Sequence, residues 1–152
     1  MTIDAGQPAP AFSLPADDGT VSLADYAGRK LVLYFYPKDD TSGCTSEAKA
    51  FRDAYDAFKA AGADVLGVSK DSAASHAKFK AKHALPFRLA ADVDGSLCEA
   101  FGTWVEKSMY GRKYMGIERA TFLIDEAGVV RRVWRKVKVT GHADEVLKAV
   151  AG

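Results

Sequence analysis

Residues 31–44, with the sequence LVLYFYPKDDTSGC, decide the fold of this chain. The first six are apolar or aromatic without interruption, a pattern typical of a strand buried on both faces of a largely parallel sheet. Pro37 ends this strand, and a polar turn follows it. Over residues 42–61 apolar side chains recur every three or four positions, which predicts an amphipathic helix that Gly62 ends. Cys44 is therefore expected in the first turn of a helix that follows a buried strand.

The segments on either side of this stretch complete an α/β pattern. Residues 17–19 have the sequence DDG, which is typical of a tight turn and predicts an N-terminal β-hairpin over residues 12–22. We expect one domain over residues 1–152, with a central mixed β-sheet flanked by helices. The remaining expected elements are strands at 63–68, 87–91, 121–124 and 129–134, and helices at 71–83, 94–101 and 142–150.

The composition excludes several classes of function. The 152 residues include 21 Lys and Arg against 20 Asp and Glu, so the formal net charge is only +1. This balance gives no global field that would attract nucleic acid or an anionic membrane. The start of the chain has no signal-peptide pattern, and no apolar run reaches the ~18–20 residues that a membrane helix needs. We expect a soluble cytoplasmic protein without nucleic-acid or membrane partners.

The two cysteines, Cys44 and Cys98, are too few for a disulfide scaffold. At a helix start, a thiol feels unpaired backbone N–H groups and the positive end of the helix dipole, which favour the reactive thiolate. A single cysteine is nevertheless more often a small core residue. The neighbours of Cys44 are polar and turn-forming, unlike a core, so the residues alone leave both interpretations open.

Around Cys44 the chain resembles the peroxiredoxins. Their pattern Pro-x-x-x-Thr-x-x-Cys occurs at Pro37, Thr41 and Cys44. The flanking segments are similar to one subfamily, called peroxiredoxin Q or bacterioferritin comigratory protein, and the likeness extends over nearly the whole chain. Those segments are YFYPKD at 34–39, GCTSEA at 43–48 and GIERATFLID at 116–125. Ser42 is a departure, because the subfamily commonly has proline there. The resemblance implies a thioredoxin-like fold.

The resemblance also implies a role for each residue of the motif. Cys44 would attack a peroxide oxygen and become a sulfenic acid, while water or an alcohol leaves. Thr41 would offer its hydroxyl to the sulfur and the peroxide, and Arg119 would hold the thiolate and the charge on the breaking O–O bond. Pro37 would cover the sulfur, and Glu47 would orient Arg119 by a bidentate pair. Taken singly, Pro37 could be a strand terminator, Thr41 a helix cap and Arg119 a solvated charge.

The resolving step is where the chain departs from its relatives. Many members of the subfamily carry a second cysteine at one of two positions, which correspond here to Lys49 and Lys80. Cys98 lies elsewhere, among apolar neighbours, and is expected to be a structural thiol. This departure predicts a one-cysteine peroxidase, and the resemblance favours a monomer; we expect no cofactor. The peroxidase would reduce hydrogen peroxide and small organic hydroperoxides, with thioredoxin, glutathione or glutaredoxin as the external thiol.

Two other functions stay open. A disulfide oxidoreductase on the same fold needs Cys-x-x-Cys, and Glu47 stands where the second cysteine would be. A non-catalytic thiol-bearing binding or chaperone module is not excluded, because a fold does not determine a function.

The remaining motifs are weak. Histidines 76, 83 and 142 show no metal-ligand spacing, and we expect no metal; the first two are expected on a solvated helix face. The basic segment 131–138 is expected to be an edge strand with a solvated face, and Gly111-Arg112-Lys113 lacks the remainder of a phosphate loop.

Overall fold

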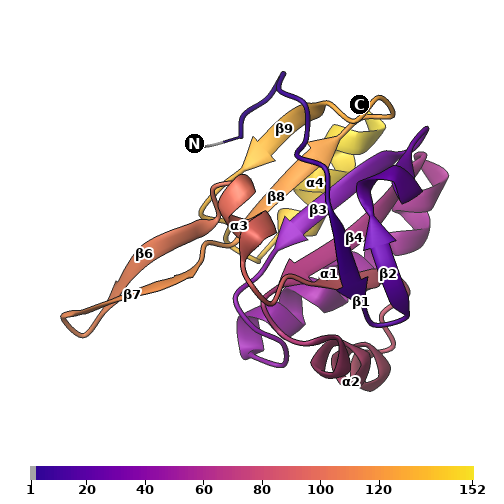
Figure 1. Cartoon of the computed structure of the whole chain (residues 1–152). Coiled ribbons are helices and arrows are strands. Elements are labelled where there is room, and N and C mark those ends of the chain that lie inside the picture. The colour runs from indigo at the N-terminus through magenta and orange to yellow at the C-terminus, as the bar shows by residue number, and fades with distance from the viewer. Residues whose placement is uncertain (1–2) are drawn as a thin grey trace.

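The computed structural model describes residues 3–152 and has a seven-stranded mixed sheet at its centre (Figure 1). The strand order is β2-β1-β5-β4-β3-β8-β9. Three strands in its middle are parallel: β3 (Lys30–Phe35), β4 (Ala63–Ser69) and β5 (Arg88–Ala91). The other strands are antiparallel to their neighbours: β1 (Ser13–Ala16), β2 (Gly19–Ser22), β8 (Ala120–Ile124) and β9 (Val130–Trp134).

Both faces of β3 are buried, as its uninterrupted apolar sequence predicts. Val32 and Tyr34 belong to one core cluster, whereas Leu33 and Phe35 belong to the other, because successive side chains of a strand point to opposite faces. Three helices contribute to the Val32 cluster: α1 (Ser42–Ala60), α2 (Ala73–His83) and α4 (His142–Ala151). The opposite cluster receives α3 (Ser96–Ala100) and the 3₁₀ helix η1 (Leu23–Tyr26).

A second hairpin, β6 (Trp104–Met109) and β7 (Arg112–Ile117), projects from the body of the molecule and was not predicted (Figure 1). Most of its side chains are exposed on both faces, so the sequence lacks the alternation that identifies a half-buried strand. Gly111, with φ +78°, forms its turn rather than any part of a phosphate loop.

Other sequence predictions can be compared with the structure directly. The basic edge strand is confirmed for residues 131–134, because β9 ends the sheet and exposes Arg131 and Arg132. Residues 135–138 lie beyond the strand. The prediction of an exposed His76 is wrong, because its side chain is fully buried. His83, the last residue of α2, keeps part of its surface in solvent. Among residues 3–152 no helix combines the length and apolar character needed to cross a membrane.

Candidate active site

Cys44 is the third residue of α1, close to the C-terminal end of β3, where ligands bind in open α/β sheets. Its polar neighbours suggested an open setting, but the side chain is only 1% exposed and packs in the core cluster beneath α1. The backbone explains both facts, since the first turn of α1 directs this one side chain inward while Thr41 and Ser42 stay exposed. The thiol is thus buried directly beside an exposed turn.

Arg119 reaches Cys44 because of the sheet topology. Strand β8 pairs with β3 so that Ala120 lies opposite Phe35, which puts the preceding residue beside the start of α1. Its Nη2 donates a hydrogen bond to Sγ of Cys44 at 3.4 Å, and its Nη1 donates to Oε1 of Glu47 at 2.6 Å. One guanidinium therefore bridges the thiol and a carboxyl group across 75 residues of sequence.

The contact between Glu47 and Arg119 differs from the predicted bidentate pair. Only Oε1 accepts a bond from the guanidinium, and Oε2 is buried without a hydrogen-bond partner among the described residues. The second terminal nitrogen of the guanidinium, Nη2, donates to the sulfur of Cys44 instead. Burial raises the pKa of Glu47 to about 7, although the nearby Arg119 acts in the opposite direction. Glu47 therefore positions Arg119, but ionisation of this buried carboxyl group lowers the stability of the folded chain.

Gly43 makes this approach possible, a role that the sequence interpretation missed. A Cβ atom added at Gly43 would lie 3.2 Å from Nη2 of Arg119, closer than most side-chain contacts allow. The glycine thus leaves room for the guanidinium over the first turn of α1. The sequence feature that could have indicated this role is a glycine directly before the cysteine, because glycine is normally disfavoured inside a helix.

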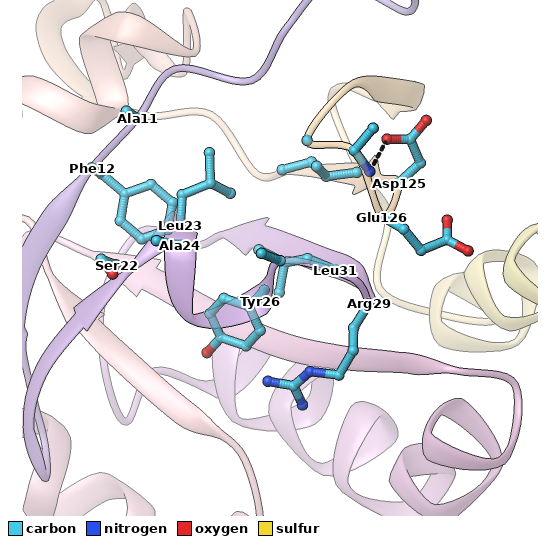
Figure 2. A pocket seen from close by; sticks show the side chains of 14 residues that line it. Ala11, Phe12, Ser22, Leu23, Ala24, Tyr26, Arg29, Leu31, Asp125 and Glu126 are labelled. Atoms are coloured by element: carbon cyan, nitrogen blue, oxygen red, sulfur yellow. Dashed lines mark hydrogen bonds between the residues drawn. The ribbon is translucent and has the colours of Figure 1, made fainter.

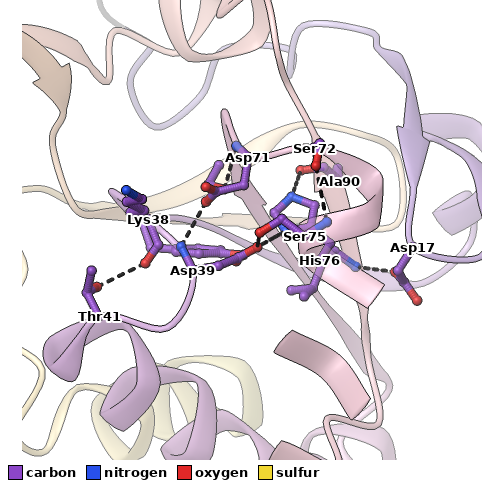
Figure 3. A network of polar contacts seen from close by, with 12 residues as sticks. Asp17, Lys38, Asp39, Thr41, Asp71, Ser72, Ser75, His76 and Ala90 are labelled. Carbon is purple, nitrogen blue, oxygen red and sulfur yellow. Dashed lines mark hydrogen bonds and ion pairs between the residues drawn. The ribbon is translucent and has the colours of Figure 1, made fainter. Parts of the chain in front are cut away.

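Thr41 and Pro37 occupy the turn between β3 and α1. Thr41 is the N-cap of α1, but its hydroxyl donates a hydrogen bond to the carbonyl of Lys38 at 2.9 Å instead of capping the helix (Figure 3). Its hydrogen is thus already used, which leaves the oxygen free to accept a bond from a substrate. Pro37 is half-buried and lies two residues after the end of β3.

The positions considered for a resolving cysteine lie apart from this arrangement. Lys49 is exposed on α1, and Lys80 forms an ion pair with Asp17 at 2.8 Å. Cys98 is 0% exposed and lies in the core cluster on the opposite face of the sheet from Cys44. Burial raises the pKa of Cys98, and its contacts with Asp92 act in the same direction.

One largely apolar cavity lies away from Cys44. It has a volume of about 350 Å³ and lies by the N-terminal end of β3 (Figure 2). The thiol lies beyond the C-terminal end of that strand. Its apolar wall consists mainly of Phe12, Leu23, Tyr26, Leu31 and Ile124. This cavity therefore takes no part in the thiol chemistry.

Comparison with known proteins agrees with this geometry. Residues 5–133 match the AhpC/TSA family. Over 148 residues the chain is 55% identical to the putative peroxiredoxin bcp of Coxiella burnetii, covering 97% of this chain and 98% of the relative. The chain belongs to the peroxiredoxin family. This peroxiredoxin is also 52% identical to peroxiredoxin Bcp of Bacillus subtilis, over 99% of this chain and 96% of the relative.

A solved structure of peroxiredoxin Q from Xanthomonas campestris has a TM-score of 0.90 and 48% sequence identity to this peroxiredoxin, covering 97% of each chain. This similarity confirms the thioredoxin-like fold with its N-terminal strands, and it confirms the resemblance to the Q and bacterioferritin comigratory branch.

Because Glu47 is buried, we expect the stability of the folded state of this peroxiredoxin to depend on pH. Glu47 has a raised pKa in the folded chain, so the folded state binds its proton more tightly than the unfolded state. Between about 4.5 and 7, stability therefore falls as the pH rises and Glu47 ionises in its buried site. We expect Glu47→Gln to flatten this part of the stability profile, as measured by urea unfolding. An unchanged pH slope would contradict the assignment.

Proposed function

We propose that this peroxiredoxin is a thiol-dependent peroxidase that reduces hydrogen peroxide and small organic hydroperoxides at Cys44. The observation that carries the proposal is the guanidinium of Arg119, which contacts Cys44 and Glu47 at once. A structure of the bacterioferritin comigratory protein of Xanthomonas campestris, 47% identical with a TM-score of 0.90, concerns its alkyl peroxide reduction activity. We propose that the present chain also reduces alkyl hydroperoxides.

The proposed reaction gives a role to four residues of the site. The Cys44 thiolate attacks the terminal oxygen of the hydroperoxide, and a sulfur–oxygen bond forms as the O–O bond breaks. Sulfur is oxidised by two electrons to the sulfenic acid, and the leaving oxygen takes a proton from solvent to become water or an alcohol. Thr41 accepts a hydrogen bond from the peroxide, while Arg119 stabilises the negative charge. Pro37 shields the sulfur from bulk water.

The absence of cysteine at positions 49 and 80 supports a one-cysteine cycle. An external thiol attacks the sulfenic acid, releases water and leaves a mixed disulfide on Cys44. A second thiol then forms the external disulfide and regenerates the Cys44 thiol. Thioredoxin, glutathione or glutaredoxin can supply these electrons, and we propose the reducing cytoplasm as the location of the enzyme. We propose a monomer that needs no metal or cofactor. A disulfide oxidoreductase is disfavoured, because Glu47 replaces the second cysteine that it requires.

The one-cysteine cycle predicts the product of a single turnover without reductant. After one equivalent of peroxide, we expect the intact mass to increase by one oxygen, because Cys98 is buried on the far face of the sheet. Cys98→Ser should retain about half or more of the thiol-dependent activity, because it leaves the reacting groups in place. A loss of two hydrogens in the wild-type protein, absent in Cys98→Ser, would instead identify a Cys44–Cys98 disulfide.

A further inference from the structure

A buried polar network holds the turn that precedes Cys44 (Figure 3). The carboxylate of Asp39, in this turn, accepts hydrogen bonds from three side chains. Tyr36 donates at 2.6 Å and Ser75 at 2.8 Å, and Nδ1 of His76 lies 2.8 Å away. The backbone N–H of Asp39 donates to Asp71 at 2.8 Å. Side chains of α2 and the loop before it therefore fix the turn between β3 and α1.

Both ring nitrogens of His76 face oxygen atoms. Its Nε2 lies 2.9 Å from the backbone carbonyl of Ala90, which can only accept, so Nε2 carries a proton. Its Nδ1 faces Oδ2 of Asp39. Burial tends to raise the pKa of Asp39, but the hydrogen bonds from His76, Tyr36 and Ser75 outweigh it and hold that pKa below its usual value. Oδ1 of Asp39 also accepts a hydrogen bond from Tyr36, and Oδ2 accepts one from Ser75, which favours the ionised carboxylate. Nδ1 of His76 therefore faces an acceptor, as Nε2 does, and both ring nitrogens carry a proton.

This pair is well suited to be a fixed anchor. The His76 side chain is 0% exposed, and the Asp39 side chain is 4% exposed, so water cannot replace their mutual contact. A buried charge that loses its partner is strongly unfavourable, which makes separation of the two rare. The neighbouring Asp40 adopts a left-handed conformation with φ +61°, unusual for a residue other than glycine. The anchor thus adjoins a residue of unusual backbone conformation, whose carboxylate in turn contacts Lys82 and His83 of α2.

We propose that His76 and Asp39 form a buried imidazolium–carboxylate pair that positions the catalytic turn, and through it Thr41 and Cys44, for attack on a peroxide. The pair acts through a short path. Asp39 follows Lys38, whose carbonyl accepts the Thr41 hydroxyl, and Thr41 begins the helix that carries Cys44. His76 is therefore a positioning residue for the reaction proposed above, on which this inference rests.

The charge state can be tested in the wild-type protein by nitrogen NMR of the histidine side chains at about pH 8. We expect two protonated ring nitrogens with similar shifts for His76. His142 is an internal reference in the same spectrum, because burial lowers its pKa and keeps the ring neutral with two well-separated shifts. A neutral His76 pattern would overturn the ionic pair. This measurement does not depend on peroxidase activity, so it is independent of the proposed function.

The positioning role can be tested by comparing two reactions of Cys44. Oxidation by hydrogen peroxide needs Thr41 and Arg119 correctly placed, whereas alkylation by iodoacetamide needs only an accessible thiolate. For His76→Gln we expect oxidation to slow by about 10- to 100-fold, because displacements near 1 Å have effects of this size. Alkylation should change by less than about threefold. Equal changes in both rates, or an unchanged oxidation rate, would overturn the proposal.

Two further variants complete the test. His142→Gln also removes a buried histidine, but its ring contacts Thr121 and not the catalytic turn, so the ratio of oxidation to alkylation should stay as in wild type. Ser75→Ala removes one hydrogen bond to Asp39 and keeps the charged pair. If His76→Gln does not fold, Ser75→Ala should still lower that ratio, by about threefold; an unchanged ratio would contradict the inference. The wild-type oxidation rate separately tests the proposed function.

Discussion

Cys44→Ser is expected to reduce thiol-dependent peroxide consumption by about a thousandfold or more, which corresponds to about 4 kcal/mol of transition-state stabilisation. Serine has nearly the same shape, so the buried site beneath α1 should keep its packing. Its hydroxyl, however, does not ionise readily, and its attack on a peroxide would only replace one weak O–O bond with another. The measurement is the steady-state disappearance of hydrogen peroxide with dithiothreitol as the thiol.

The matched control for this prediction is Cys98→Ser. This variant removes the other thiol. Cys98 is also buried, but it lies in the core cluster on the opposite face of the sheet. If loss of any buried thiol disturbed the fold enough to stop turnover, both variants would be inactive. Loss in Cys44→Ser alone assigns the reaction to one sulfur. Wild-type turnover in Cys44→Ser would refute the proposed mechanism and favour a non-catalytic thiol protein.

The elements around Cys44 could be predicted from the sequence because each follows a strong local pattern. An uninterrupted apolar segment marks β3, and helical spacing of apolar residues marks α1. The contact with Arg119 could not be derived from such patterns, because it depends on the pairing of β8 with β3. Only the resemblance to a known family suggested it. The resemblance did not predict that Glu47 accepts only one hydrogen bond from Arg119. That contact depends on the guanidinium donating one N–H group to Glu47 and another to Cys44.

His76 shows a different limit of sequence interpretation. Helix α2 has a weak apolar stripe in which His76 and Phe79 are its buried residues, so spacing alone gave no reason to place a histidine inside. Its burial depends on partners from two other segments: Tyr36 and Asp39 before α1, and the carbonyl of Ala90 in β5. A polar residue is buried where its hydrogen bonds are satisfied, and that condition is a property of the tertiary structure.

The second large effect is expected for Arg119→Ala, which should lower kcat/KM for hydrogen peroxide by about 10²–10³-fold, the size seen when one charge-stabilising donor is removed. The variant removes the bond to Sγ of Cys44 and leaves the carboxyl group of Glu47 buried without its partner. That carboxyl group should then bind its proton more tightly, because burial remains and the opposing effect of Arg119 is gone. The activity is measured by stopped-flow oxidation of Cys44 over a range of peroxide concentrations.

Arg119→Lys separates charge from geometry. Lysine keeps the positive charge near the thiol, but its single ammonium group cannot reproduce the planar fork that reaches Cys44 at 3.4 Å and Glu47 at 2.6 Å together. If the fork matters, Arg119→Lys should lose most of the activity that Arg119→Ala loses, although its net charge is that of wild type. If a positive charge alone is enough, the lysine variant should stay within about threefold of wild type. The second result would assign Arg119 an electrostatic role and remove the need for Glu47 to orient it. Loss in both variants would instead explain why a carboxyl group is kept in a buried site where its ionisation is costly.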